Sequence, residues 1–375
     1  MNPLKKLSDF GQAPWLDDIR RGLIESGELD KLIEEDGLRG ITSNPSIFQK
    51  AIADSDEYDG AIRELAQGGK DTEEIYFELA TKDIRDAADR FRPLYDDNSG
   101  ERGFVSLEVS PHLAHDAQGT VEEARQLWKM LDRPNVFIKV PGTKEGLEAI
   151  TQLIGEGISV NVTLLFGLPR YREVAEAYIE GLERRLEGGE SVDGIASVAS
   201  FFLSRIDVLV DGKLDQIAEA SPEDADTAKT LRGEVAIASA KQAYQIYKEV
   251  FESERFKSLS EKGAKPQRLL WASTSVKDDA YEDVKYVEAL IGPETVNTLP
   301  METLEAYRDH GQPEARLEDD VDEAKRTLDK LGDLGIDIDE VTQQLEDEGV
   351  QKFVKPFDSL METIASKRNE VLETA

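Results

Sequence analysis

The sequence predicts an α/β fold in which parallel strands close into a (β/α)8 TIM barrel. Short runs of β-forming residues alternate with amphipathic helical stretches along most of the chain. Such alternation indicates a parallel sheet, and about eight strand–helix units close a barrel. The length of 375 residues is sufficient for one barrel with additional helices.

Eight runs share the residue types that favour strands. They are residues 13–17, 39–43, 104–109, 135–140, 157–162, 194–199, 268–273 and 295–299. Helix signals follow most of them. Asn44 or Ser46 is expected to cap a helix after the second run, because Asn and Ser are preferred caps. After the fourth run we expect a helix over 147–154, with Gly155 marking its end.

Helical insertions interrupt the alternation of strands and helices. Residues 51–93 and 211–256 have helical apolar spacing, whereas 258–267 has the composition of a loop. The tail 312–375 is expected to form helices packed on the barrel. We therefore expect residues 1–375 to form one domain with these additions.

The formal net charge is −33. Such a charge would repel nucleic acids and anionic membranes. Either a solvated surface or adaptation to a high-salt cytoplasm explains the excess of acidic residues. No apolar run is long enough to span a bilayer, and the N-terminus lacks the apolar core of a signal peptide. Together with the absence of cysteine, these features favour a cytoplasmic protein without membrane partners.

Lys139 is a single cation within a run of β-forming residues. A strand of this composition is normally buried on both faces, where an ammonium loses its hydration. Burial favours the neutral amine, which is a nucleophile toward carbonyl carbon. The alternative is an edge strand that leaves Lys139 in water.

Polar residues near the ends of the other strands offer partners for Lys139. They are Asp17, Asn44, Glu108, Asn161, Thr163, Ser200 and Ser273. In barrel enzymes the catalytic groups lie at the carboxyl ends of the strands. Asn and Ser at such positions also cap helices, and Asp17 could cap a helix beginning near Ile19. A buried lysine converging with carboxylates is nevertheless suited to Schiff-base chemistry.

Two cations could form an anion site on the same face of the barrel. Arg205 lies in the first turn of a helix that follows a strand, and Lys277 lies just after the next strand. Helix N-termini and arginine both favour phosphate. The alternative is that Arg205 pairs with Asp207 or Asp211.

The three histidines do not suggest a metal site. His112 and His115 are three residues apart, and neither His310 nor another residue supplies an evident third ligand. The sequence also lacks the glycine-rich loops of nucleotide-binding proteins.

Several segments, in one chain order, resemble the transaldolases of the pentose phosphate pathway. They are 15–17 (Trp-Leu-Asp), 40–48 (Gly-Ile-Thr-Ser-Asn-Pro-Ser-Ile-Phe), 106–111 (Ser-Leu-Glu-Val-Ser-Pro), 138–141 (Ile-Lys-Val-Pro), 161–166 (Asn-Val-Thr-Leu-Leu-Phe), 200–207 (Ser-Phe-Phe-Leu-Ser-Arg-Ile-Asp) and 271–274 (Trp-Ala-Ser-Thr). The resemblance covers about residues 15–300 and is strongest to the longer bacterial forms. It implies a barrel of the class I aldolase type that uses neither a metal nor an organic cofactor.

The resemblance also implies roles for four catalytic residues. Lys139 would form the Schiff base with the keto carbon of sedoheptulose 7-phosphate or fructose 6-phosphate. Asp17 would take the C4 hydroxyl proton during carbon–carbon cleavage. Glu108 and Thr163 would handle the water of carbinolamine dehydration.

Further positions match the substrate contacts of the family. Asn44, Asn161 and Ser200 would hold the dihydroxyacetone hydroxyls, and Ser273 is expected to line the same site. Phe202 matches an aromatic wall residue that is more often Tyr in fructose-6-phosphate aldolases. Its presence therefore favours transfer to an aldose over release of free dihydroxyacetone.

One departure from the family concerns the phosphate site. Arg205 matches a phosphate-binding arginine, but Ser275 stands where many transaldolases have a second one. We expect Lys277 to supply the missing charge without the bidentate fork of arginine.

Other functions remain open at this point. The chain could be a direct aldolase, an inactive barrel that serves as a scaffold, or an acidic helical interaction protein. The sequence does not distinguish a monomer from a homodimer.

Overall fold

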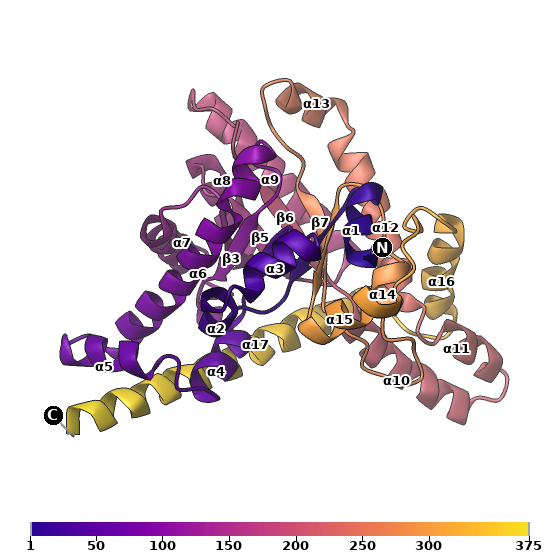
Figure 1. Ribbon diagram of the computed structural model, residues 1–375. Helices are drawn as coiled ribbons and strands as arrows, with labels where there is room; N and C mark the ends of the chain where they lie inside the picture. Colours follow the sequence, from indigo (N-terminus) through magenta and orange to yellow (C-terminus); the bar gives the residue numbers. More distant parts are fainter. Residues whose placement is uncertain (1, 374–375) are drawn as a thin grey trace.

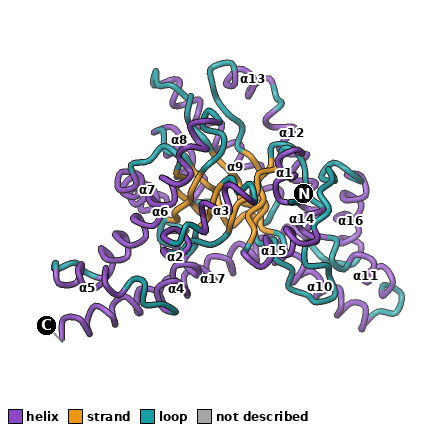
Figure 2. The backbone as a smooth tube through the Cα atoms, viewed as in Figure 1, coloured by secondary structure: helices purple, strands orange, loops and turns teal. Residues whose placement is uncertain are grey.

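The fold is a closed barrel of parallel strands surrounded by helices, as the sequence predicts. The structure is a computed structural model that describes residues 2–373. Each strand pairs in parallel with its neighbours in chain order, and β8 closes the barrel against β1. Figure 2 shows the strands at the centre and the helices outside them. The strands are β1 (Gln12–Leu16), β2 (Gly40–Thr42), β3 (Phe104–Glu108), β4 (Val136–Pro141), β5 (Val160–Leu165), β6 (Ser197–Phe202), β7 (Arg268–Ala272) and β8 (Thr295–Leu299).

The helices follow the strands, with additional helices between and after them (Figure 1). Before β6 they are α1 (Pro3–Leu7), η1 (Ser8–Phe10), α2 (Arg21–Glu25), α3 (Glu28–Glu35), α4 (Pro45–Ala53), α5 (Asp59–Gln67), α6 (Thr72–Asp97), η2 (Pro111–Leu113), α7 (Ala117–Leu131), α8 (Gly146–Glu156) and α9 (Leu168–Glu187). After β6 they are α10 (Ser204–Ala220), α11 (Ala225–Leu231), α12 (Val235–Phe251), α13 (Glu254–Ser260), α14 (Lys285–Glu288), α15 (Met301–His310), α16 (Val321–Asp333) and α17 (Ile338–Glu373). Within residues 2–373, none of these helices has the length and apolarity needed to cross a membrane.

Two of the expected strands begin later than predicted. β5 starts at Val160 rather than at Gly157, and β6 starts at Ser197 rather than at Gly194. Both glycines have positive φ, 89° and 83°, and such backbone belongs to turns rather than strands. The β-forming composition of the flanking residues concealed these turns.

Helix ends were predicted with mixed success. Asn44 caps α4, since its side chain accepts a hydrogen bond from the backbone N–H of Ile47 at 3.0 Å, while Ser46 lies inside the helix. The expected end at Gly155 is wrong: α8 continues through it, and the left-handed Gly157 terminates the helix. The expected loop over 258–267 is partly wrong because α13 extends to Ser260.

Aromatic side chains fill the part of the barrel nearer the strand starts. The ring of Phe137 stacks against those of Phe104 and Trp15, with centroids 4.2 and 6.1 Å away. A side chain at Gly40 would clash with Trp15, because its Cβ would lie 2.4 Å from the indole ring. This packing leaves the polar residues farther along the strands to line the other end.

The long helix α17, drawn in yellow in Figure 1, joins distant parts of the chain. It packs against α4, α5, α6 and α10 and also contacts β5. The ion pair of Arg170 with Glu346, at 3.2 Å, ties it to α9. Gly349 allows close approach to the barrel, since a Cβ there would lie 3.1 Å from Leu164.

Candidate active site

Lys139 lies inside the barrel and is paired with a carboxylate. Its Nζ lies 3.1 Å from Oε2 of Glu108 on β3, and the two side chains are only 6% and 4% exposed. Nζ also donates a hydrogen bond to the carbonyl oxygen of Ser43 at 3.0 Å. β4 is bonded to β3 and β5 on its two sides. The alternative of an exposed edge strand is therefore wrong.

Burial and neighbouring charges act on the Glu108 carboxyl in opposite directions. Burial raises the pKa of Glu108, while the charge of Lys139 and a hydrogen bond to it act in the opposite direction. The nearby charge of Asp17 raises this pKa further. Within residues 2–373, Oε1 of Glu108 has no hydrogen-bond partner, so this oxygen is available to a bound molecule.

Asp17 directly follows β1, and its carboxylate interacts electrostatically with Glu108 and Lys139. Its Oδ1 accepts a hydrogen bond from the Thr42 hydroxyl at 2.8 Å. Burial raises the pKa of Asp17, and the charges of Lys139 and Arg205 oppose this shift. Asp17 does not cap the next helix, because α2 has Arg20 at its N-cap. The alternative structural role is therefore wrong.

A hydrogen-bonded row of small polar side chains lines the wall beside Lys139. Asn161 is paired with Lys139 in the β4–β5 register and is fully buried. Its amide donates to the Ser106 hydroxyl at 3.1 Å, and its carbonyl oxygen accepts from the Ser200 hydroxyl at 2.7 Å. The row fixes the orientation of the Asn161 amide across three strands.

Thr163 lies next to a strained point in β5. The register between β5 and β6 shifts between Val162 and Leu165. Leu164 has a φ of 61°, which is rare for a bulky residue and marks a position held by its surroundings. The Thr163 hydroxyl is buried and, within residues 2–373, has no hydrogen-bond partner. Like Glu108, it can accept or donate to a bound molecule.

Arg205 is the second residue of α10 and does not pair with the nearby aspartates. Asp207 instead accepts from the Tyr286 hydroxyl and Asp211 from the Tyr281 hydroxyl, each at 2.7 Å. The alternative ion pair is therefore wrong. Nη1 of Arg205 is buried and, within residues 2–373, lacks a hydrogen-bond partner. The guanidinium is free to take an anion.

The loop after β7 carries the other expected polar residues. Ser273 has a φ of 55°, and its hydroxyl lies 2.9 Å from that of Ser204 at the start of α10. This contact joins the ends of β6 and β7. Ser275 is buried and accepts a hydrogen bond from the exposed Lys277 amine at 2.6 Å. Ser275 and Lys277, which are both expected at the phosphate site together with Arg205, therefore contact each other.

Phe353 of α17 is a site residue that the sequence analysis missed. Its buried ring lies 5.9 Å from Nζ of Lys139 and 6.0 Å from the guanidinium carbon of Arg205. The guanidinium also lies 5.5 Å from the ring of Phe202. The tail thus supplies part of the wall between the lysine and the arginine. An apolar residue in a helical pattern carries no signal for such a position.

The histidines pair with carboxylates rather than with one another. His112 contacts Asp358 at 2.7 Å, and His115 contacts Glu145 at 3.1 Å. In the part of the chain that the structure describes, residues 2–373, no group of three or more His, Asp or Glu side chains could hold a metal ion.

A barrel with a buried lysine and two carboxylates near the carboxyl ends of its strands is the arrangement of the Schiff-base-forming aldolases. Comparison with known proteins specifies the family. Residues 14–364 match the family model described as Transaldolase/Fructose-6-phosphate aldolase. The chain belongs to this family.

Relatives of similar length support the assignment. The chain is 50% identical over 370 residues to "Transaldolase" of Trichodesmium erythraeum, covering 98% of this chain and 97% of the relative. It is 49% identical to "Transaldolase 2" of a Nostoc strain and 48% identical to "Transaldolase" of Thermobifida fusca, each time covering 98% of both chains.

Proposed function

We propose that this protein is a transaldolase. It transfers a dihydroxyacetone unit from sedoheptulose 7-phosphate to glyceraldehyde 3-phosphate, giving erythrose 4-phosphate and fructose 6-phosphate in the non-oxidative pentose phosphate pathway. The observation that carries the proposal is the buried contact of 3.1 Å between Lys139 and Glu108. Such a pair holds an amine beside a group that can exchange its proton.

In the proposed reaction, Lys139 passes a proton to Glu108, and its amine then attacks the keto carbon of the donor sugar. The resulting carbinolamine loses water, with the proton supplied through Glu108 and Thr163, whose free oxygens favour this role. Asp17 then takes the proton of the C4 hydroxyl, and the bond between C3 and C4 breaks. The aldose leaves, and the electrons of the broken bond form the double bond of an enamine, which keeps the three-carbon unit attached to Lys139.

The second half of the reaction reverses these steps. The enamine carbon attacks the aldehyde of the acceptor, and Asp17 returns its proton to the new hydroxyl. Water then hydrolyses the imine and releases Lys139. The Schiff base is needed because the protonated imine accepts the electrons of the C3–C4 bond during cleavage.

The remaining polar residues are proposed to hold the substrate. Asn44, Asn161, Ser200 and Ser273 would contact the hydroxyls of the dihydroxyacetone unit. Asn161 and Ser200 support this role because their mutual hydrogen bond of 2.7 Å orients both groups. Preorganised donors of this kind do not need to reorient during the reaction.

The phosphate of the substrate is assigned to Arg205, assisted by Ser275 and Lys277. The unpartnered Nη1 of Arg205 favours this role. Phe202 and Phe353 flank the guanidinium and limit its access to water. Their rings also favour the cation electrostatically.

Borohydride trapping tests the proposal directly. The protein is mixed with fructose 6-phosphate, reduced with borohydride, digested and mapped by mass spectrometry. We expect a reduced dihydroxyacetone adduct on the peptide that contains Lys139 and none in Lys139→Met. Lys277→Met is the matched control and should retain the adduct. An adduct on another lysine, or none, contradicts the assignment.

Direct aldol cleavage is the second candidate, because the matched family also includes fructose-6-phosphate aldolases. A coupled assay of fructose 6-phosphate with and without erythrose 4-phosphate separates the two. We expect turnover only with the acceptor. Phe202→Tyr should shift the ratio toward release of free dihydroxyacetone, whereas Phe166→Tyr, which alters the neighbouring ring 5.3 Å away, serves as a control.

Three further proposals concern the whole chain. We propose that residues 1–375 act as one catalytic domain, with the helix α17 completing the site. We also propose a cytoplasmic location, where the sugar phosphates of this pathway occur. Sugar phosphates are the proposed small-molecule partners, and a monomer and a homodimer both agree with the described fold.

A further inference from the structure

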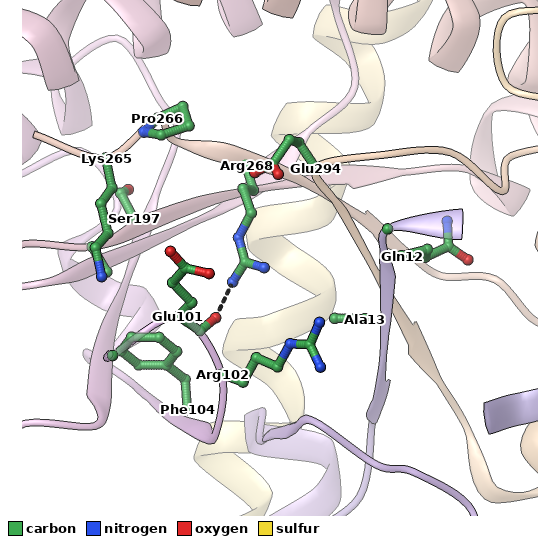
Figure 3. A pocket seen from close by; sticks show the side chains of 13 residues that line it. Gln12, Ala13, Glu101, Arg102, Phe104, Ser197, Lys265, Pro266, Arg268 and Glu294 are labelled. Carbon is green, nitrogen blue, oxygen red and sulfur yellow. Dashed lines mark hydrogen bonds between the residues drawn. The ribbon is translucent and has the colours of Figure 1, made fainter. Parts of the chain in front are cut away.

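A cavity lies at the end of the barrel where the strands begin. Figure 3 shows the side chains that line it. Its volume is about 150 Å³. Its wall includes Gln12, Phe104, Ser197 and Arg268, which are the first residues of β1, β3, β6 and β7. Lys139 lies near the carboxyl end of β4, so the two sites are separated by the aromatic layer of the barrel.

Three cations line this cavity without forming ion pairs. They are Arg102, Lys265 and Arg268, and Figure 3 shows both arginines extending into the same space. Within residues 2–373, no carboxylate forms an ion pair with any of them. Arg268 donates to the carbonyl oxygen of Glu101 at 3.0 Å, and Lys265 donates to that of Ser99 at 2.6 Å. These bonds position the two cations without pairing either of them with a carboxylate in an ion pair.

The arginines at this end of the barrel also repel one another. Burial lowers the pKa of Arg268 and of Arg39, and the charge of Arg102 also lowers both. The charges of Glu294 and Glu101 raise the pKa of Arg268 and so compensate it in part. Nε of Arg39 is buried and lacks a hydrogen-bond partner within residues 2–373. A chain with a net charge of −33 thus concentrates like positive charges in one recess. An anion bound among them would relieve the repulsion.

Two carboxylates limit what the cavity can hold. Glu101 and Glu294 also line the wall, so three cations against two carboxylates leave a formal charge of +1. This balance favours a compact anion over an extended polyanion. An engineered cavity of about 150 Å³ accommodates a molecule the size of benzene, so a tetrahedral oxyanion fits the space.

We propose that this cavity binds a small oxyanion, an inorganic phosphate or the phosphoryl group of a small metabolite, between Arg102, Arg268 and Lys265. Arginine binds such groups with paired N–H donors. The anion would connect the loop before β3 with the loop before β7, because Arg102 and Lys265 belong to these loops. The site is separate from the phosphate contact proposed for Arg205.

Calorimetric titration of the full chain with inorganic phosphate tests the proposal, at an ionic strength held constant with chloride. The Arg205→Gln variant removes the contact proposed at the active site and should retain phosphate binding. Arg102→Gln in that background should weaken the remaining binding about tenfold or more, since a charged hydrogen-bonding group is lost. Arg63→Gln is the matched control, because Arg63 is an exposed arginine of α5.

Further variants separate the binding site from folding and catalysis. Arg102→Lys keeps the charge and should lower the affinity by only a few-fold. Arg102→Gln alone should leave the transferase rate unchanged, because Arg102 lies at the opposite end of the barrel. In the Arg205→Gln background, phosphate but not chloride should raise the melting temperature. This increase should disappear when Arg102→Gln is added and persist when Arg63→Gln is added. Equal phosphate binding by the Arg102 and Arg63 variants, or an equal response to chloride, overturns the proposal.

Discussion

Replacing Lys139 by methionine should destabilise the protein in a way that depends on Glu108 and on pH. Methionine keeps the length and apolar volume of the lysine stem but removes its charge. Glu108 would then be a buried carboxylate without the contact of 3.1 Å that it has to Lys139. Removing one partner of a buried ion pair typically costs ~3–5 kcal/mol. Solvent screens this interaction little, because the two side chains are only 6% and 4% exposed.

The sign of the pH dependence follows from the direction of the pKa shift. Burial raises the pKa of Glu108 above its usual value of 4.5, and Lys139 opposes the increase. Above about pH 4.5 the unfolded chain releases a proton that Glu108 keeps in the folded state. The free energy of unfolding therefore decreases as the pH rises toward the pKa of Glu108 in the folded state. Without Lys139 the folded pKa rises further. In the variant, the decrease in the free energy of unfolding should continue to higher pH, at about 1.4 kcal/mol for each pH unit.

Urea unfolding followed by circular dichroism between pH 5 and 8 would measure this effect. The variant Lys139→Met should lose progressively more stability with increasing pH relative to the parent. The double variant Lys139→Met/Glu108→Gln should recover most of the loss at pH 8, because it buries no charge. A loss that is independent of pH and unaffected by Glu108→Gln would refute the reasoning.

Three other outcomes are expected. Arg205→Ala should raise the KM for erythrose 4-phosphate about tenfold or more, because a partly buried cation is lost. Lys277→Ala should raise this KM only a few-fold, because Lys277 is exposed. An unchanged KM in Lys277→Ala would exclude its proposed role. Gly349→Ala should change the free energy of unfolding little, since better helix propensity offsets the contact of 3.1 Å between the new Cβ and Leu164. Gly349→Val should lower it by ~1–3 kcal/mol through overpacking, as measured by thermal or urea unfolding. Equal stabilities of the two variants would contradict that packing. If the charge of −33 reflects a high-salt cytoplasm, stability should rise with molar KCl, and equal stability in dilute buffer would argue against it.

The strand positions show how far sequence patterns extend. The run that became β8 was predicted at its observed bounds, Thr295–Leu299. β5 and β6 were placed too early, because their preceding turns depend on the left-handed backbone of Gly157 and Gly194. The composition of a run indicates a preference for strand, but it does not show where a left-handed glycine separates the turn from the strand.

The candidate site was predictable where a residue type is unusual for its element. A lysine in a strand of β-forming residues pointed to Lys139, and a glutamate in a similar strand pointed to Glu108. Ser106 and Thr42 were missed because small hydroxyl side chains are ordinary in strands. Only the bonds of Ser106 to Asn161 and of Thr42 to Asp17, at 3.1 and 2.8 Å, distinguish them.

Local sequence patterns were sufficient to predict the order of strands and helices and to mark Lys139 as a residue unusual for a strand. These features follow from local preferences and from the alternation of side chains along a strand. The contacts between distant segments became visible only in the folded structure. The placement of Phe353 beside Lys139 and the gathering of Arg102 and Arg268 depend on closing the barrel and packing its additional helices. Such contacts arise from the combined packing of many residues, so no local pattern specifies them.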